Sequence, residues 1–267
     1  MDFAQSFREF LSQEGIAFHC VGNSFHFDNS LTITLVPLDG LAINGSADGI
    51  SLEQACARKV IHLYEDRWRG RQELVKARIL AHLGRQRSIF ARKCKVTKLS
   101  AEETASFLEA NHIYGSARCK HRYGLRFADE LVAVSTFSAP RPITRIVEGE
   151  ERIVNSYEWV RFASLPQCRV VGGMGRLLKA FEDDVHPQDV MSYADREWSE
   201  GAVYERLGFH RTGDVPPVEF LVDTETWRRI STRKLSNDRS CRGLAVDGDR
   251  YVPVRNLGSI KYVKTMI

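Results

Sequence analysis

The sequence has no run of about 18 or more apolar residues, the length that a helix needs to cross a lipid bilayer. Its opening residues, MDFAQSFREF, lack the basic stretch followed by an apolar stretch that defines a secretory signal. We therefore expect a cytoplasmic protein with no membrane partner.

Closely spaced cysteines are also lacking. The six cysteines are scattered along the chain without a C-x-x-C pair, the spacing that closes many zinc and redox sites. We expect reduced, structural thiols and no bound metal.

A large excess of charge of either sign is absent as well, because the formal net charge is +4 in 267 residues. With 43% hydrophobic and 27% charged residues, the composition is that of a globular protein, long enough for two domains. Basic residues gather in two stretches, from Arg67 to Lys98 and from Arg228 to Arg242. Each stretch fits either a surface that follows a phosphate backbone or a solvated helix face beside a charged linker.

The N-terminal part contains short elements of both kinds. Phe3, Phe7, Phe10 and Leu11 share one face of a helix predicted over residues 2–14. Strands are predicted at 17–21, 24–27, 31–36 and 41–44, followed by a helix at 52–59, a strand at 60–64 and a helix at 71–83. This pattern predicts a small α/β module that ends near Phe90.

Beyond residue 90, strands come first and then alternate with helices. A strand at 94–99 precedes Ser100 and Glu103, which form a capping box for a helix at 101–110. Strands are predicted at 123–127, 131–137 and 157–162, then a helix at 176–182, a strand at 190–193, a helix at 201–207 and a strand at 209–212. The order predicts a mixed α/β (α+β) fold. We divide the chain into domains at 1–90 and 91–235, and an extension at 236–267 that packs on the second domain.

Gly172, Gly173 and Gly175 lie in the segment VVGGMGRLL, between a predicted strand and a predicted helix. Glycines let backbone amides approach a ligand closely, and a helix N-terminus offers unpaired N–H groups to a phosphate. The segment fits either a pyrophosphate site or a plain glycine turn before a helix.

A second segment, SYADREWSEGAVYERLGF at 192–209, carries Tyr204 on a helix that ends at the C-cap signal Leu207-Gly208-Phe209. The two segments in this order resemble the GNAT superfamily, in which a glycine loop holds the coenzyme A pyrophosphate and a Tyr-x-x-x-Gly-Phe helix flanks the thioester arm. The resemblance implies a GNAT fold with acetyl-CoA or another acyl donor bound by Arg169, Gly172, Gly173, Gly175 and Arg176. The loop departs from the family pattern, because Val170 stands where the family has Arg or Gln.

A narrower resemblance covers nearly the whole chain. It rests on NHIYGS at 111–116, YGL at 123–125, YEWVRF at 157–162, VGG at 171–173, SYADR at 192–196 and NLGSIK at 256–261. These segments are similar to those of phage-borne proteins labelled homing-endonuclease-like and, more distantly, to the GNAT-like phage Mom proteins that modify adenine in DNA. The resemblance implies DNA as a partner and the host-cell cytoplasm as the location of a phage protein.

The segment VIHLYEDRWRGRQELVKARI at 60–79 resembles a Vsr-like PD-(D/E)XK nuclease. Such nucleases hold a divalent cation with carboxylates on adjacent strands. The expected acids are replaced by Thr32, Thr34 and Asn44, and the acids nearby have turn-like settings: Asp28, Asp39 and Asp48. We interpret residues 1–90 as a degenerate, DNA-binding module.

Acyl transfer needs a base, donors for the thioester oxyanion and an acid for the leaving thiolate. Glu158 lies in an aromatic strand where burial can raise the pKa of a carboxyl and favour a base, although an outward-facing strand residue fits the same pattern. The other catalytic candidates are Ser192, Asp195 and Tyr204, the last of which fits either an acid or a core residue.

A mixture of basic and aromatic residues suits a nucleobase taken out of its stack. The candidates that contact the acceptor are His112, Tyr114, Arg161, Tyr193, Arg196 and Trp198, together with Arg141, Arg145 and Trp159. Both tryptophans also fit core positions.

The leading hypothesis is therefore a phage-type enzyme of GNAT fold that transfers an acyl or aminoacyl group onto a nucleobase in DNA. The alternatives are a homing-endonuclease-like protein that cleaves DNA and a DNA-binding protein without catalytic activity.

Overall fold

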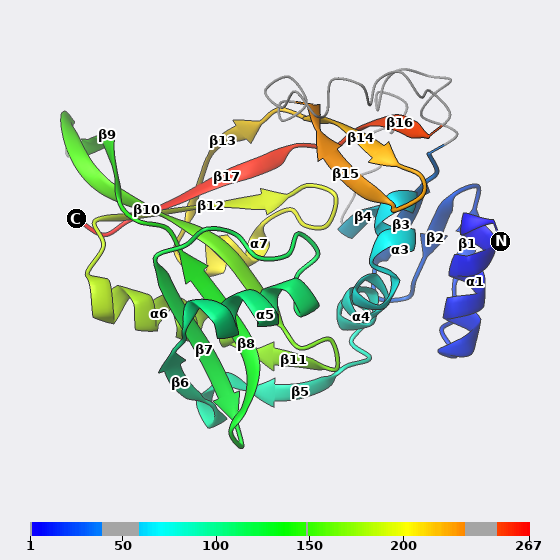
Figure 1. Cartoon of the computed structure of the whole chain (residues 1–267), viewed down its shortest axis with the longest axis horizontal. Helices are drawn as coiled ribbons and strands as arrows, with labels where there is room; N and C mark the ends of the chain where they lie inside the picture. The colour runs from blue at the N-terminus through cyan, green and yellow to red at the C-terminus, as the bar shows by residue number, and fades with distance from the viewer. Residues whose placement is uncertain (1, 39–58, 148, 233–249) are drawn as a thin grey trace. The chain divides into compact units, whose positions relative to one another are not determined.

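A computed structural model describes residues 2–38, 59–147, 149–232 and 250–267 (Figure 1). The predicted strand at 41–44, almost all of the predicted helix at 52–59, and Asp39, Asn44 and Asp48 lie outside the described residues. No helix in the described ranges is long and apolar enough to cross a membrane. Two compact units form, and each draws on three stretches of chain. Unit 1 comprises 1–76, 194–201 and 214–260, and unit 2 comprises 77–193, 202–213 and 261–267.

Unit 1 contains a four-stranded sheet in the order β1 (His19–Val21), β2 (Ser24–His26), β3 (Leu31–Val36), β4 (Lys59–Tyr64). The first three strands are antiparallel and β4 runs parallel to β3. Helix α1 (Phe3–Gln13) begins at Asp2, whose carboxylate accepts the Gln5 N–H, and it buries its predicted aromatic face.

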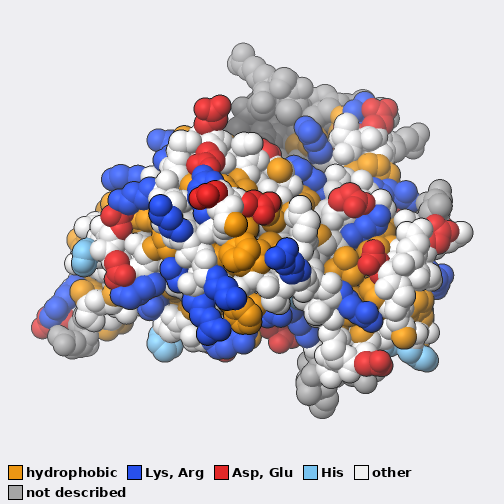
Figure 2. All heavy atoms as spheres, turned by 90° about the horizontal axis from the view of Figure 1, so that it is seen from below, with side chains coloured by type: hydrophobic (Ala, Val, Ile, Leu, Met, Phe, Trp, Pro, Cys, Tyr) orange, Lys and Arg blue, Asp and Glu red, His pale blue; other side chains and the backbone are white. Residues whose placement is uncertain are grey.

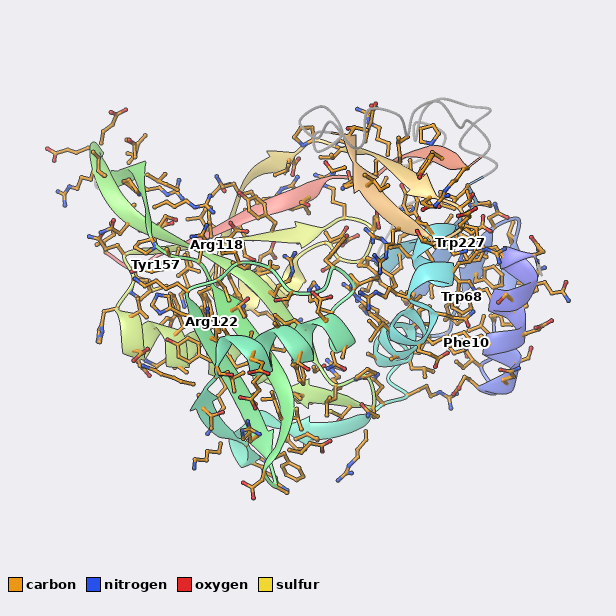
Figure 3. The ribbon with its side chains drawn as sticks, viewed as in Figure 1. Phe10, Trp68, Arg118, Arg122, Tyr157 and Trp227 are labelled. Atoms are coloured by element: carbon orange, nitrogen blue, oxygen red, sulfur yellow. The ribbon has the colours of Figure 1, made fainter. Side chains whose placement is uncertain are left out.

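Trp68, on helix α3 (Glu65–Gly70), packs within this aromatic core (Figure 3). Its ring lies 5.4 Å from the Phe7 ring and 5.6 Å from the Phe10 ring, measured between centroids. Helix α4 (Gln72–His82) follows and carries the chain from unit 1 into unit 2.

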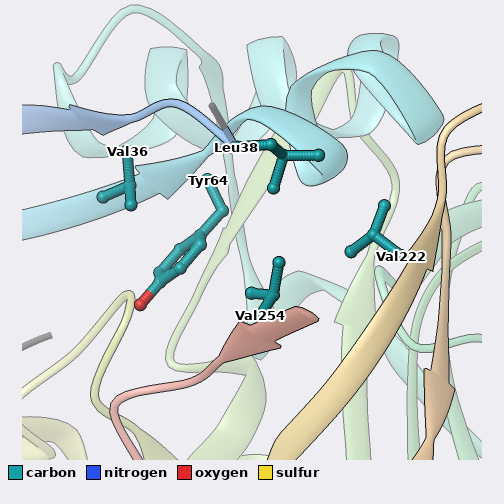
Figure 4. Close-up of a cluster of buried hydrophobic side chains, with 5 residues drawn as sticks. All are labelled: Val36, Leu38, Tyr64, Val222 and Val254. Atoms are coloured by element: carbon teal, nitrogen blue, oxygen red, sulfur yellow. The ribbon is translucent and has the colours of Figure 1, made fainter. Parts of the chain in front are cut away.

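A second sheet in unit 1 has the order β15 (Arg228–Ser231), β14 (Glu219–Asp223), β16 (Tyr251–Arg255). Val222 and Val254 of this sheet share a core with Val36, Leu38 and Tyr64 (Figure 4). Residues from both ends of the chain therefore build one hydrophobic core.

Unit 2 is built on an eight-stranded sheet. Its strands are β6 (Lys95–Lys98), β7 (His121–Phe127), β8 (Glu130–Phe137), β9 (Arg141–Val147), β10 (Glu150–Ser164), β12 (Asp189–Asp195), β13 (His210–Val215) and β17 (Ser259–Thr265). The order is β13-β17-β12-β10-β8-β7-β6, with β9 paired to the first half of β10 as a ribbon (Figure 1).

Two helices cover opposite faces of this sheet. Helix α5 (Ala101–Asn111) begins at Ser100, whose hydroxyl accepts the Glu103 N–H, and its Leu108 packs with Val134 of β8. Helix α6 (Gly173–Val185) stacks Phe181 on Phe137 of β8, with ring centroids 3.9 Å apart. Because side chains alternate along a strand, Val134 and Phe137 point to opposite faces.

The remaining elements of unit 2 are short. They are β5 (Arg87–Phe90), which pairs in parallel with β11 (Cys168–Val171), the 3-10 helix η3 (Ala91–Lys93), and helix α7 (Ala202–Arg206).

The predicted mixed α/β class is confirmed. The predicted division at 90 and 235 does not coincide with the two compact units, because unit 2 begins at Ala77 and takes its last segment from 261–267. The predicted extension supplies β16 to a sheet of unit 1 and β17 to the large sheet.

Candidate functional site

The candidate site of unit 2 lies where the parallel ladder between β10 and β12 ends. The two strands pair only from Ser156 to Glu158 on β10, and the second half of β10 then pairs with β8, with a register shift between Trp159 and Arg161. The Trp159 carbonyl accepts instead from the Ser192 hydroxyl of β12, at 3.1 Å. A side chain thus bridges β10 and β12 where their backbone ladder stops.

Tyr204 of α7 completes this bridge. Its hydroxyl lies 3.0 Å from the Ser192 hydroxyl, and its ring stacks on Tyr262 of β17 with centroids 5.2 Å apart. Burial raises the pKa of Tyr204 and keeps the phenol protonated at neutral pH. The Ser192 hydroxyl has one hydrogen. When it donates that hydrogen to the Trp159 carbonyl, Tyr204 must be the donor in the contact between the two hydroxyls.

Glu158 lies at the end of the same ladder. The Ser138 hydroxyl accepts its backbone N–H at 2.9 Å, and Arg141 Nη2 lies 3.7 Å from its carboxylate. The carboxylate is 24% exposed, so a ligand can reach it. Because Trp159 faces Phe137 and the α6 side, alternation puts Glu158 on the α5 side.

The Glu158 charge affects the pKa values of Tyr193 and Arg161. Burial raises the pKa of Tyr193, and the nearby Glu158 charge adds to that rise. Burial lowers the pKa of Arg161, an effect that Glu158 opposes. The Glu158 carboxylate thus acts electrostatically on both the phenol and the guanidinium.

His112 and Tyr114 form a fixed loop end after α5. The Tyr114 N–H donates to His112 Nδ1 at 3.1 Å, and Arg161 Cζ lies 5.9 Å from the Tyr114 ring centroid. Burial, with the charges of Arg161 and Arg78, lowers the pKa of His112 to about 3. His112 is therefore a neutral hydrogen-bond acceptor in this structure, whereas the Tyr114 ring is 41% exposed.

The glycine turn connects β11 to α6. Gly172 has φ +75° and is the N-cap, without a side-chain capping bond. A Cβ at Gly173 would lie 3.1 Å from Val170, and one at Gly175 would lie 3.1 Å from Leu207. Positive φ and close packing explain these glycines, and the uncapped first turn leaves its amides available to an anion.

Two arginines flank this turn. Arg169 is exposed on β11, and Arg176 is partly buried in the first turn of α6, where its charge acts on the Cys94 thiol. An anion at the turn would therefore meet backbone amides and the Arg176 side chain, and Arg169 lies on the strand that leads into the turn.

Asp195, Arg196 and Trp198 belong to unit 1. The Asp195 carboxylate accepts the Glu197 N–H at 2.9 Å, and Arg196 pairs with Asp214 at 2.7 Å. Trp198 is fully buried, so its ring cannot stack on a base. In unit 2 the structure pairs Ser192 with Tyr204 and places Tyr193 near Glu158, on the other face of the sheet. Asp195, Arg196 and Trp198 instead have structural contacts in unit 1.

Arg145 and Trp159 also have structural roles. Arg145 forms a bidentate pair with the buried Asp189, at 2.9 and 3.2 Å, which occupies its guanidinium. Trp159 is buried at 4% exposure. Sequence reasoning missed Ser138 and Tyr262, because hydroxyl and ring contacts between distant strands leave no local pattern.

Two further features of the described residues bear on the chemistry. No group of three or more His, Cys, Asp or Glu could hold a metal ion in the described ranges. An open depression of about 660 Å³ lies in unit 1 and includes His19, His26 and Asp28, none of them among the predicted site residues. The candidate chemistry of unit 2 therefore does not depend on that depression.

No family model matches the sequence, and no curated protein matches it. Solved structures that match the chain include a Bacillus subtilis acetyltransferase in complex with CoA, at 13% identity and TM-score 0.39, covering 66% of this chain and 100% of that chain. A GNAT family acetyltransferase from Elizabethkingia anophelis with acetyl-CoA bound matches at 9% identity and TM-score 0.35, covering 65% of this chain and 99% of that chain. The Escherichia coli ribosomal-protein-S18-alanine N-acetyltransferase matches at 12% identity and TM-score 0.38, covering 65% of this chain and 96% of that chain.

Proposed function

We propose that unit 2 is a GNAT-type acyltransferase domain that uses acetyl-CoA or a related thioester and acylates an amino group of a nucleobase in DNA. The observation that carries the proposal is the end of the β10–β12 ladder, where Glu158 lies on one face and the Ser192–Tyr204 hydroxyl pair on the other. A candidate base and a candidate acid thereby flank the end of the ladder, and acyl transfer uses one group of each kind.

The first chemical step is attack on the thioester. The acceptor nitrogen forms a bond to the thioester carbonyl carbon, and the Glu158 carboxylate takes the proton that this nitrogen loses. Arg141 Nη2 lies 3.7 Å from the Glu158 carboxylate, and the Glu158 charge also acts on Arg161.

The second step is loss of the thiol. The carbon–sulfur bond breaks with its electron pair on sulfur, and the Tyr204 hydroxyl gives a proton to the thiolate. The Ser192 hydroxyl then turns its hydrogen from the Trp159 carbonyl to the phenolate, across their 3.0 Å contact, and the proton held by Glu158 returns through water to Tyr204. The products are an amide and a free thiol, so atoms and charge balance.

The glycine turn fits the phosphate part of such a donor. Amides of the first turn of α6, with Arg176, would hold the pyrophosphate of coenzyme A. When bound, the coenzyme supplies the activated acyl group as a thioester.

The acceptor side supports a flat, polar ligand. Tyr114 and Tyr193 are 41% and 37% exposed, and Arg161 lies over Tyr114. Exposed rings and guanidinium planes are the groups on which unpaired bases stack. Together with the distant resemblance to the phage Mom proteins that modify adenine in DNA, this favours a base of DNA over a small amine.

The test is incubation of the protein with DNA and a panel of acyl-CoA donors, followed by digestion to nucleosides and mass analysis. We expect a nucleoside that is heavier by the acyl group, and its absence with the Glu158→Gln variant. Unchanged nucleosides with every donor, together with plasmid nicked only in the presence of magnesium, would instead support the endonuclease-like alternative.

A further inference from the structure

The parallel pair β5–β11 has one buried and one exposed face. Ile89, Cys168 and Val170 are buried at 8%, 5% and 8% exposure. On the other face, Phe90 and Val171 are 45% and 37% exposed and are direct partners in the ladder. Phe90 and Val171 thus form a small contiguous apolar patch, and contiguous exposed apolar patches can mark binding surfaces.

This face is also basic. Arg169 lies opposite Ser88 in the ladder, on the same face as Phe90, and Arg92 of η3 lies 5.2 Å from the Phe90 ring centroid. We call Ser88, Phe90, Arg92, Arg169 and Val171 the β5–β11 face. All five are exposed.

The surrounding chain carries positive charge only. Residues 84–98 contain no acidic residue and six basic ones, Arg85, Arg87, Arg92, Lys93, Lys95 and Lys98. Lys98 pairs with Asp184, whereas Arg92, Lys93 and Arg169 form no ion pair within the described ranges. Figure 2, which views the side on which β5 and β11 lie in Figure 1, shows many Lys and Arg side chains, with some Asp and Glu, among apolar side chains.

The face is held rigidly. Gln86, just before β5, donates from Nε2 to the Ala77 carbonyl at 2.7 Å and to the Pro166 carbonyl at 2.5 Å. Ala91, directly after β5, lies 3.9 Å from the position of a Cβ at Gly172. A ligand on the face therefore meets a preformed surface that continues into the glycine turn.

We propose that the β5–β11 face binds single-stranded DNA, with one base stacked on Phe90 and the adjoining phosphates on Arg92 and Arg169. A single strand fits better than a duplex, because a duplex hides the base faces on which an aromatic ring stacks. This inference rests on the proposed function in one respect, that the bound strand also carries the acceptor base. The binding itself needs neither donor nor transfer.

The first test measures binding of a fluorescent oligothymidylate to the full-length protein by anisotropy at several salt concentrations. Phe90→Ala should weaken binding about tenfold, the loss expected for one stacked base, and Phe90→Trp should retain it. Replacing Arg92 and Arg169 together by Gln should lower the slope of log affinity against log salt by about 1.4, since each phosphate contact on a single strand contributes about 0.7.

The matched control replaces Arg118 and Lys120 by Gln, which removes two exposed positive charges from another part of unit 2. This control should keep the salt slope of the unaltered protein. Equal loss in the control, or wild-type binding by Phe90→Ala, would overturn the proposal. Equal competition by polyglutamate and by oligothymidylate would overturn it as well, because polyglutamate has no bases and would indicate a site for acidic protein segments.

Transfer is measured separately with a single-stranded acceptor. Phe90→Ala should raise the acceptor KM about tenfold and leave kcat unchanged. If the binding pattern holds but no nucleoside is acylated, the proposed function fails and the binding face stands. If acylation occurs and the variants bind as the unaltered protein does, the face fails and the proposed function stands.

Discussion

Arg229 of β15 is the most enclosed cation described in unit 1. Its guanidinium donates to Asp66 of α3 at 2.7 and 3.1 Å and to Glu197 at 2.7 Å, and the three side chains are 4%, 1% and 0% exposed. Burial alone would lower the pKa of Arg229, but the two carboxylates raise it and hold it charged. The cluster ties together segments that are far apart in the sequence.

Removal of this cation should therefore destabilise the protein. Arg229→Met removes the cation that both buried carboxylates bind and leaves them, among the described ion pairs, only the longer contact of Arg67 with Asp66, at 3.9 Å. We expect a loss of about 3–5 kcal/mol in the free energy of unfolding, measured by urea denaturation. Arg250→Met is the matched control, because Arg250 also pairs with a carboxylate, Asp223, but is 36% exposed. Equal losses for the two variants would contradict the assignment of the effect to burial.

His112 makes stability depend on pH. Its pKa is lowered to about 3 in the folded protein, against an ordinary value of 6.5, so the unfolded chain binds more protons between these values. Stability attributed to His112 is therefore complete above about pH 6.5 and falls as the pH drops toward 3, by at most about 1.4 kcal/mol per pH unit.

Urea denaturation at several pH values tests this expectation. His112→Asn keeps an acceptor for the Tyr114 N–H but does not titrate, so its stability should fall less steeply below pH 6.5. His210→Asn, at an exposed position on β13, serves as the control and should keep the wild-type slope. A slope that is unchanged in His112→Asn would show that His112 is protonated freely in the folded state.

The proposed role of Tyr204 as the proton donor can be tested with one substitution. Tyr204→Phe removes the proton donor and should lower kcat for acyl transfer by about 100-fold, with little change in donor KM. Steady-state kinetics with acetyl-CoA and the acceptor found in the nucleoside assay provide the measurement. Tyr262→Phe is the control, because that ring stacks on Tyr204 but its hydroxyl faces Glu205. A comparable loss in both variants would point to packing rather than proton transfer.

At the scale of elements, the turn between β11 and α6 depends on one backbone conformation. Gly172 has φ +75°, a region that costs an alanine about 1–2 kcal/mol and an asparagine less. Gly172→Ala should lower the free energy of unfolding by that amount and raise the donor KM, whereas Gly172→Asn should do so more weakly. Thermal unfolding and kinetics for both variants provide the check. An alanine variant that is as stable as the asparagine variant would contradict the role of positive φ.

Elements with a strong local signal could be predicted from the sequence. Helix α1 follows from its periodic aromatic residues, and α5 follows from the Ser100 cap. The position of the turn at Gly172 could also be predicted, because a glycine cluster between a strand and a helix is a local turn signal. The predicted helix began three residues late, at 176, because Gly172 caps α6 and Gly173 is its first residue.

Elements that depend on distant partners could not be predicted. Strand β9 is stabilised as a ribbon by β10, and β14 pairs with β16, which lies some distance along the chain. The candidate site has the same limit. Glu158, Ser192 and Tyr204 could be named from local patterns, but the Ser192 contact with the Trp159 carbonyl depends on where the β10–β12 ladder stops.

At the scale of the whole molecule, the chain enters and leaves each unit more than once. Unit 1 takes segments at 194–201 and 214–260 from between parts of unit 2. Many contacts are therefore between residues far apart in sequence, which slows folding because loop closure must precede them. Neither unit is a continuous segment of chain, so cutting at the predicted boundaries would remove strands from both.

Truncation after Leu235 tests this directly. The cut removes β16, which pairs with β14, and β17, which lies between β12 and β13 in the large sheet. It also removes the buried Tyr262 and Val263, at 1% and 5% exposure. We expect the truncated chain to lose cooperative thermal unfolding, as followed by far-UV circular dichroism, because two sheets would each lose a paired strand. Deletion of Ile267 alone, which is 57% exposed, should leave Tm within a few degrees of the full-length value. If the truncated chain instead kept the full-length Tm, residues 236–267 would be an extension that packs on a complete domain.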